Sequence, residues 1–298
     1  MFIDDFLLHL SSPSSETRRA YRDDVMRFLR FLNHSEFTLE TVTARTIELY
    51  MQSLNTNSRT GKPLAAASMS RRLTVVSTYL DYLYVKTGGA VTNHIKEVRR
   101  PKIHNVLRRA LSQDAYETLM AGITNVRDKA LIALYVASGL RLEEARQLDL
   151  TSISRHQRTM PDGTVRTLGT GEVCGKGGRS RRFFIDESTL ALLLAYMRVR
   201  GTGGGPALFL SNRKLRLSRR SIQDILDRWC IRLGLPHAHI HACRHAFATN
   251  AVNHGMSSLV LQELMGHQSF TVTQRYFSIR PERVATEYFA VQESLNGQ

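Results

Sequence analysis

The sequence predicts a mainly helical protein of two domains, with a small antiparallel β-sheet in the second domain. Apolar residues recur at spacings of three and four over residues 1–88, and again in segments beyond residue 111, which is typical of amphipathic helices. In the stretch 150–185 the residue pattern instead alternates on both sides of a Pro-Asp-Gly turn, which is typical of short paired strands. A basic segment interrupted by Pro101 joins the two parts, and 298 residues suffice for two hydrophobic cores.

The first domain is expected to contain three long helices. The first begins near Ser15, and its buried stripe consists of Tyr21, Val25, Phe28, Leu29 and Leu32. The second spans about 43–54. The third spans about 66–86, with a buried stripe of Leu73, Val76, Leu80 and Leu83. Turn-forming residues predict a loop over 55–63.

The second domain is expected to place helices before and after the sheet. Its helical segments are 112–121, 125–139, 187–200, 218–233 and 240–254. The tail 282–295 is amphipathic as well. We therefore predict a first domain over 1–98, a basic linker over 99–110 and a second domain, with its tail, over 111–298.

The charge balance points to a polyanionic partner. The chain has 41 Lys and Arg against 26 Asp and Glu, a formal net charge of +15, which favours nucleic acid or an anionic membrane. No stretch approaches the roughly 20 apolar residues of a membrane span, and the acidic N-terminus does not resemble a secretory signal. Three cysteines without a CxxC spacing indicate neither a disulfide framework nor a zinc finger. A cytoplasmic, DNA-binding protein is expected.

Four segments of the second domain concentrate residues suited to phosphodiester chemistry. They are SGLRLEEARQL with Arg141 and Glu144, GEVCGKGGRSRR with Lys176, HACRHAFATN with His241 and Arg244, and LMGHQSFTVTQRYF with His267 and Tyr276. Arginine forks bind phosphate oxygens and stay charged, which stabilises the charge that develops in the transition state. A tyrosine hydroxyl, with a pKa of about 10, needs a base or a cationic field to act as a nucleophile.

Taken singly, each of these residues has an ordinary structural reading. A lone Tyr276 is more often a core or surface residue, and a lone Arg141 a solvated helix residue. The GKGG sequence around Lys176 lacks the Ser or Thr of a phosphate-binding Walker loop. His241 and His245 have a metal-ligand spacing, but the glutamate of HExxH is missing, so no metal site is expected.

In this order the four segments closely resemble the tyrosine recombinase (phage integrase) family, and the resemblance covers nearly the whole chain. The first hundred residues resemble its helical SAM-like core-binding domain, the remainder its catalytic domain, and the length is similar to that of Xer-type recombinases. One departure is Cys243, which stands where the family usually has leucine. Both are apolar, so we expect Cys243 to face the core.

The resemblance implies a role for each motif residue. Tyr276 would attack the scissile phosphate, giving a 3′-phosphotyrosyl bond and a free 5′-hydroxyl. The other implied roles are phosphate binding by Arg141 and Arg244, donation to the phosphate by His267, acid or base assistance by His241, protonation of the leaving oxygen by Lys176, and orientation of neighbours by Glu144. The covalent bond preserves the phosphodiester energy, so neither ATP, metal nor any other cofactor is expected.

Double-stranded DNA with paired sites is the implied partner. The expected phosphate contacts are Arg99, Arg100, Lys102, Arg108, Arg109, Arg179, Arg213, Lys214, Arg219 and Arg220, although a merely solvated basic face is the alternative. The resemblance implies that the tail docks on a neighbouring protomer, of this chain or of a related recombinase, and so links four subunits on DNA. The tail could instead pack on its own domain.

Site-specific recombination through a Holliday junction is the implied function, whether as integration, excision or resolution, including that of mobile elements. A type IB topoisomerase would use the same phosphotyrosine chemistry without pairing sites. A catalytically silent DNA-binding regulator is the second alternative. Such a regulator is expected to have lost at least one of the six catalytic positions, and all six residues are present.

Overall fold

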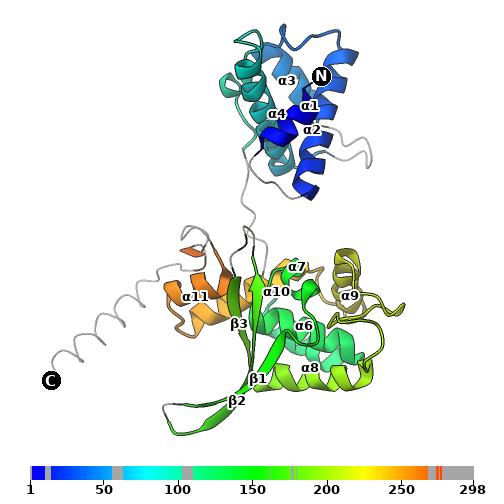
Figure 1. Ribbon diagram of the computed structural model, residues 1–298, viewed down its shortest axis with the longest axis vertical. Helices are drawn as coiled ribbons and strands as arrows, with labels where there is room; N and C mark the ends of the chain where they lie inside the picture. The colour runs from blue at the N-terminus through cyan, green and yellow to red at the C-terminus, as the bar shows by residue number, and fades with distance from the viewer. Residues whose placement is uncertain are drawn as a thin grey trace, which may run out of the picture. The chain divides into compact units, whose positions relative to one another are not determined.

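The computed structural model describes residues 2–10, 15–55, 63–102, 110–160, 162–175, 178, 180–267, 273, 274 and 276. The chain divides into two compact units, Met1–Val106 and Leu107–Gln298 (Figure 1). The described residues are mainly helical and include one three-stranded antiparallel sheet in the second unit, which confirms the predicted fold class. The predicted linker includes residues 103–109, which lie outside the described residues.

The first unit is a bundle of helices around an aromatic core. Its helices are α1 (Ile3–His9), α2 (Ser15–His34), α3 (Ala44–Ser53), α4 (Ala66–Lys86) and the 3-10 turn η1 (His94–Glu97). The predicted stripes of α2 and α4 supply buried core residues, which include Val25, Phe28, Leu32, Leu73, Val76, Leu80 and Leu83. The Phe28 and Tyr50 rings meet edge to face, with centroids 5.0 Å apart. The apolar period of the sequence therefore identified the inward faces.

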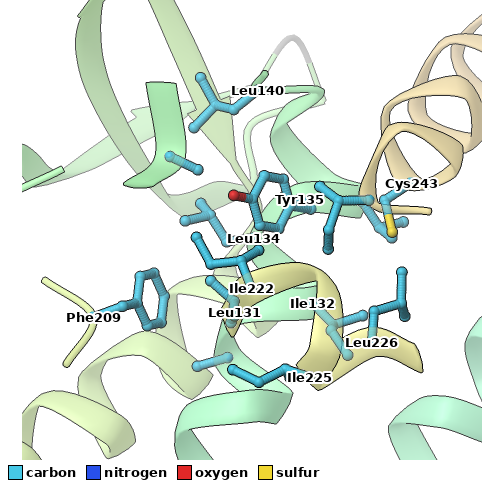
Figure 2. Packing of buried hydrophobic residues seen from close by; sticks show 14 of the residues in the cluster. Leu131, Ile132, Leu134, Tyr135, Leu140, Phe209, Ile222, Ile225, Leu226 and Cys243 are labelled. Carbon is cyan, nitrogen blue, oxygen red and sulfur yellow. The ribbon is translucent and has the colours of Figure 1, made fainter. Parts of the chain in front are cut away.

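The second unit is organised around α6 (Val126–Ser138), whose residues are mostly buried. Its helices are α5 (Gln113–Gly122), α6 (Val126–Ser138), α7 (Leu142–Gln147), α8 (Glu187–Arg200), α9 (Arg219–Arg232), α10 (Ile240–Asn253) and α11 (Ser258–Met265). Figure 2 shows Leu131, Leu134 and Tyr135 of α6 among side chains that include Ile222 of α9. Cys243 of α10 is 0% exposed in this core, as predicted, and burial raises the pKa of its thiol to about 12.

The sheet lies beside α6, α8 and α11 (Figure 1). Its strands are β1 (Ile153–Thr159), β2 (Val165–Cys174) and β3 (Ser180–Ile185), paired in the order β1-β2-β3. Ile153 pairs with Gly171, and Gly169 pairs with Ile185. Burial alternates along β3, so that Arg181 lies on the same inward face as Phe183 and Ile185. Arg181 therefore lies on the face of the sheet that is otherwise occupied by core residues.

Two short helices of the second unit were not predicted as separate elements. Helix α7 has six residues and α11 has eight, which is too short for an apolar period to emerge. Both begin at recognisable caps, since Ser257 accepts a hydrogen bond from the Val260 amide and Glu144 accepts one from the Arg141 amide. In the part of the chain that is described, no helix is long and apolar enough to cross a membrane.

Candidate active site

The two predicted arginines meet near the C-terminal end of α6. Gly139 ends this helix with φ +61°, and a Cβ there would lie 2.4 Å from Cδ1 of Phe247, so only glycine fits. Two residues later Arg141 caps α7. Arg244 reaches the same place from α10, where its guanidinium group donates to the Gly139 carbonyl. The hydrogen bond from Arg244 to the glycine that ends α6 therefore brings the first and third motifs together.

Three guanidinium groups hold the C-terminal end of α11. Arg181 donates to the Leu264 carbonyl, Arg244 to the Met265 carbonyl, and Arg141 to the Gly266 carbonyl at 2.8 Å. The last carbonyls of a helix have no partner within it and carry the negative end of its dipole. Cations from α7, β3 and α10 satisfy them. The position of α11, and of His267 directly after it, is thereby tied to the arginines.

A single buried carboxylate balances part of this charge. Glu144, 7% exposed, accepts hydrogen bonds from Arg141 Nη1 and from Arg181 Nη2, both at 2.7 Å. Burial opposes ionisation of Glu144, but the hydrogen bonds and charges of the two arginines outweigh it and lower the pKa of the carboxyl group. Glu144 is placed to orient two guanidinium groups at once.

Three cations and one carboxylate leave an excess of positive charge around Arg244. This residue is 2% exposed, and burial together with the charges of Arg141 and Arg181 lowers its pKa to about 9. Arg244 therefore remains protonated at neutral pH. The positive charges of the cluster repel one another, and an anion bound next to Arg244 would relieve this repulsion.

His267 is neutral in this environment. Burial, then the charges of Arg244, Arg141 and Arg181, lower its pKa to about 4. Its Nε2 atom lies 3.2 Å from Arg244 Nη2 and its Nδ1 atom lies 2.8 Å from Thr273 Oγ1. Because arginine only donates, Nε2 is the acceptor and Nδ1 carries the proton.

The depressed pKa of His267 predicts a loss of stability in mild acid. An unfolded histidine titrates near 6.5, so between about pH 6.5 and 4 the unfolded chain binds one proton more, and the free energy of unfolding falls as pH falls. We expect His267→Asn to flatten this slope in urea titrations performed at several pH values. An unchanged slope in His267→Asn would contradict the assignment.

Tyr276 lies next to this cluster, in the same chain. Its ring is half-buried against the small apolar cluster of Ala248, Val252, Leu261 and Met265. Its backbone amide donates to the Thr273 carbonyl at 3.0 Å. Its hydroxyl lies 2.9 Å from Nδ1 of His245, the residue that follows Arg244 on α10. The phenol oxygen is therefore held against α10, at the residue next to Arg244.

The structure brings together five of the seven predicted catalytic and supporting residues: Arg141, Glu144, Arg244, His267 and Tyr276. His241 lies at the start of α10, exposed, with its ring 4.8 Å from that of His245. Lys176 follows β2 in the chain and lies outside the described residues. Among the residues that are described, no three metal-ligating side chains gather.

The predicted DNA contacts are exposed wherever they are described: Arg99, Arg100 and Lys102 in the first unit, and Arg213, Lys214, Arg219 and Arg220 in the second. Arg108, Arg109 and Arg179 lie outside the described residues, as does the tail 282–295. Arg219 also donates to Glu143, which places the start of α9 beside α7. The contacts with DNA themselves stay predictions.

Sequence reasoning missed Arg181, Gly266 and Thr273, and it considered His245 only as a metal ligand. Alternation along β3 could have flagged Arg181 as an inward-facing charge. Gly266 has φ +59°, and a Cβ there would lie 2.7 Å from Cδ of Arg181, so glycine lets the arginines approach. No local pattern pointed to Thr273, whose role depends on its contact with His267.

Comparison with known families covers both units. Residues 109–283 match the phage integrase family, and residues 3–87 match the phage integrase N-terminal SAM-like domain. The chain is 30% identical to tyrosine recombinase XerC of Alcanivorax borkumensis over 300 residues, covering 96% of this chain and 92% of that one. It is 29% identical over 304 residues to XerC of Myxococcus xanthus, covering 96% and 95%.

Solved structures share the fold. A XerH site-specific recombinase bound to its difH substrate superposes with a TM-score of 0.67 at 18% identity, covering 91% of this chain and 78% of that one. A lambda integrase dimer bound to a core site superposes with a TM-score of 0.70 at 20% identity, covering 92% and 75%. At sequence identities this low, these structural similarities establish a shared fold.

Proposed function

Since the chain belongs to the phage integrase family, we propose that it is a site-specific DNA recombinase that cuts and rejoins strands through Tyr276. The observation that carries this proposal is the position of Tyr276: its hydroxyl contacts His245, the residue after Arg244, and its amide binds Thr273, whose hydroxyl contacts His267. A nucleophile and an excess of fixed cations in one place suit attack on a phosphodiester.

In the proposed reaction the Tyr276 oxygen forms a bond to phosphorus while the bond to the 5′-oxygen breaks. Arg141 and Arg244 bind the non-bridging oxygens, and Glu144 keeps the Arg141 fork oriented. The Arg141 side chain is 36% exposed, so its remaining N–H groups are accessible to a phosphate. Lys176 protonates the departing 5′-oxygen, with His241 assisting as acid or base.

His267 needs a change of hydrogen bonding to serve the phosphate. Its Nε2 accepts from Arg244 in the protein alone, whereas donation to a phosphate oxygen requires a proton on that nitrogen. An anion between the two groups would raise the pKa of His267 by supplying the opposite charge. Binding of DNA is therefore expected to draw a proton onto His267.

The phosphotyrosyl bond retains the energy of the broken linkage, so a 5′-hydroxyl from a second duplex reverses the reaction and yields a Holliday junction. In this proposal residues 1–98 form a DNA-binding domain, residues 99–110 a basic linker and residues 111–298 the catalytic domain. The tail joins four subunits on paired sites, with this chain or a related recombinase. The protein acts on cytoplasmic DNA in integration, excision or resolution, including that of mobile elements.

A plasmid with two copies of the target site distinguishes this function from the alternatives. With EDTA present and ATP omitted, we expect recombinant circles, because arginine and histidine supply the charge that metals supply in many nucleases. Relaxation without recombinants would favour a type IB topoisomerase. Binding without any strand cleavage would favour a silent regulator, and activity that stops on chelation alone would contradict the metal-free mechanism.

A further inference from the structure

His245 has no part in the mechanism described so far, yet it contacts the proposed nucleophile. It follows Arg244 on α10 and stands one turn after His241. Arg244 points into the core, whereas the His245 side chain is half-buried and meets Tyr276. Its Nδ1 atom lies 2.9 Å from the Tyr276 hydroxyl, and the two ring centroids are 5.4 Å apart.

Hydrogen bonds and apolar packing hold Tyr276 in this contact. The Tyr276 amide donates to the Thr273 carbonyl, and the Thr273 hydroxyl lies 2.8 Å from His267 Nδ1. The tyrosine ring packs on the cluster of Ala248, Val252, Leu261 and Met265, which comes from α10 and α11. Because α10 carries His245 as well as Ala248 and Val252, the same helix contacts both the ring and its hydroxyl.

A phenol with a pKa of about 10 is almost entirely protonated at neutral pH, so attack on phosphorus requires an acceptor for its proton. Arg244 is protonated and cannot serve. The Nε2 lone pair of His267 already accepts from Arg244, and the low pKa of His267, about 4, makes it a weak base. His245 Nδ1 is at hydrogen-bond distance from the reacting oxygen itself.

We propose that His245 is the proton acceptor for Tyr276, an assignment that rests on the proposed function. As the Tyr276 oxygen bonds to phosphorus, its proton moves to Nδ1 of His245, while the bond from phosphorus to the 5′-oxygen breaks and that oxygen is protonated by the leaving-group acid. Religation runs the same transfers backwards. His245 returns the proton to the phenol, so no oxidant, metal or other reactant is needed.

The first test uses His245→Asn, which keeps a polar atom near the Nδ1 position but cannot take up a proton. His254→Asn, at the exposed end of the same helix, is the matched control. A nicked substrate that releases a short strand traps the covalent complex. We expect adduct formation by His245→Asn to be slower by about 100-fold or more, the usual contribution of a general base, with DNA affinity unchanged and the control at the wild-type rate.

The pH profile and chemical rescue separate proton transfer from structural support. The titratable or charged groups near this site include His241 and Arg244 on α10, His267 after α11, and Tyr276. The wild-type rate should stop rising once the imidazole is neutral. The His245→Asn rate should keep rising about tenfold per pH unit towards the phenol pKa. Added imidazole should accelerate His245→Ala and leave the wild type unchanged.

The outcomes are distinguishable from failure of the proposed function. If wild-type protein forms no adduct, the recombinase proposal itself fails. If wild type forms the adduct and His245→Asn is equally fast, the function stands and His245 is not the acceptor. A slow His245→Asn that keeps the wild-type pH profile, together with His245→Ala that added imidazole does not accelerate, would assign His245 a packing role and overturn the inference.

Discussion

Replacement of Tyr276 by phenylalanine is expected to abolish the covalent protein–DNA adduct and to leave DNA affinity at the wild-type level. The substitution removes only the hydroxyl, whose hydrogen bond to His245 contributes on the order of 1 kcal/mol to stability. The ring still packs against α10 and α11. The adduct is measured by denaturing gels after incubation with nicked substrate, and affinity by gel shift at fixed salt.

Tyr84→Phe is the matched control, because Tyr84 is 51% exposed and belongs to the first unit, whereas all four motifs belong to the second. This variant should form adduct as the wild type does. An adduct that persists in Tyr276→Phe would place the nucleophile on another side chain. Lost DNA binding in Tyr276→Phe would instead mean that the hydroxyl supports the fold or the interface.

Glu144→Gln is expected to lower the free energy of unfolding by about 3–5 kcal/mol, the usual cost of removing one partner from a buried ion pair. Glu144 is the carboxylate that Arg141 and Arg181 share, and the Arg181 side chain is only 5% exposed. The neutral amide would leave Arg181 as a buried cation beside Arg244. Urea titration at neutral pH measures the change.

Glu143→Gln provides the comparison at the adjacent position. Glu143 pairs with Arg146 and Arg219, and its side chain is 31% exposed, so its loss should cost under about 1 kcal/mol. Equal losses of unfolding free energy in Glu144→Gln and Glu143→Gln would contradict the assignment of Glu144 as the buried partner of the two arginines. Glu144→Gln should also slow adduct formation, because the Arg141 fork loses the carboxylate that orients it.

Much of the fold was accessible from the sequence because long amphipathic helices carry a repeated signal. The stripe of α4, from Leu73 to Leu83, and the buried position of Cys243 followed from spacing and apolar character. The sheet followed from alternation around its turn. Helices α7 and α11 were missed as separate elements because so few turns carry little periodic information, although Ser257 and Gly266 mark the two ends of α11.

The candidate site was predictable in its residue types and only partly in its geometry. The spacing of Arg141 and Glu144 fits their contact within one helical turn. Attachment of Arg141, Arg181 and Arg244 to three consecutive carbonyls at the C-terminal end of α11 could not be predicted, because those arginines are far apart in the chain. The contact between His245 and Tyr276 could not be predicted either, because 31 positions separate the two residues in the chain.

Identification of the residue that carries the nucleotide tests the central claim most directly. The adduct trapped from wild-type protein is digested with protease and nuclease, and the modified peptide is sequenced by mass spectrometry. Phosphotyrosine at residue 276, bonded to the 3′ side of the break, is the predicted result. A nucleotide on any other side chain, or strand cleavage that proceeds with no protein-bound nucleotide, would contradict the account.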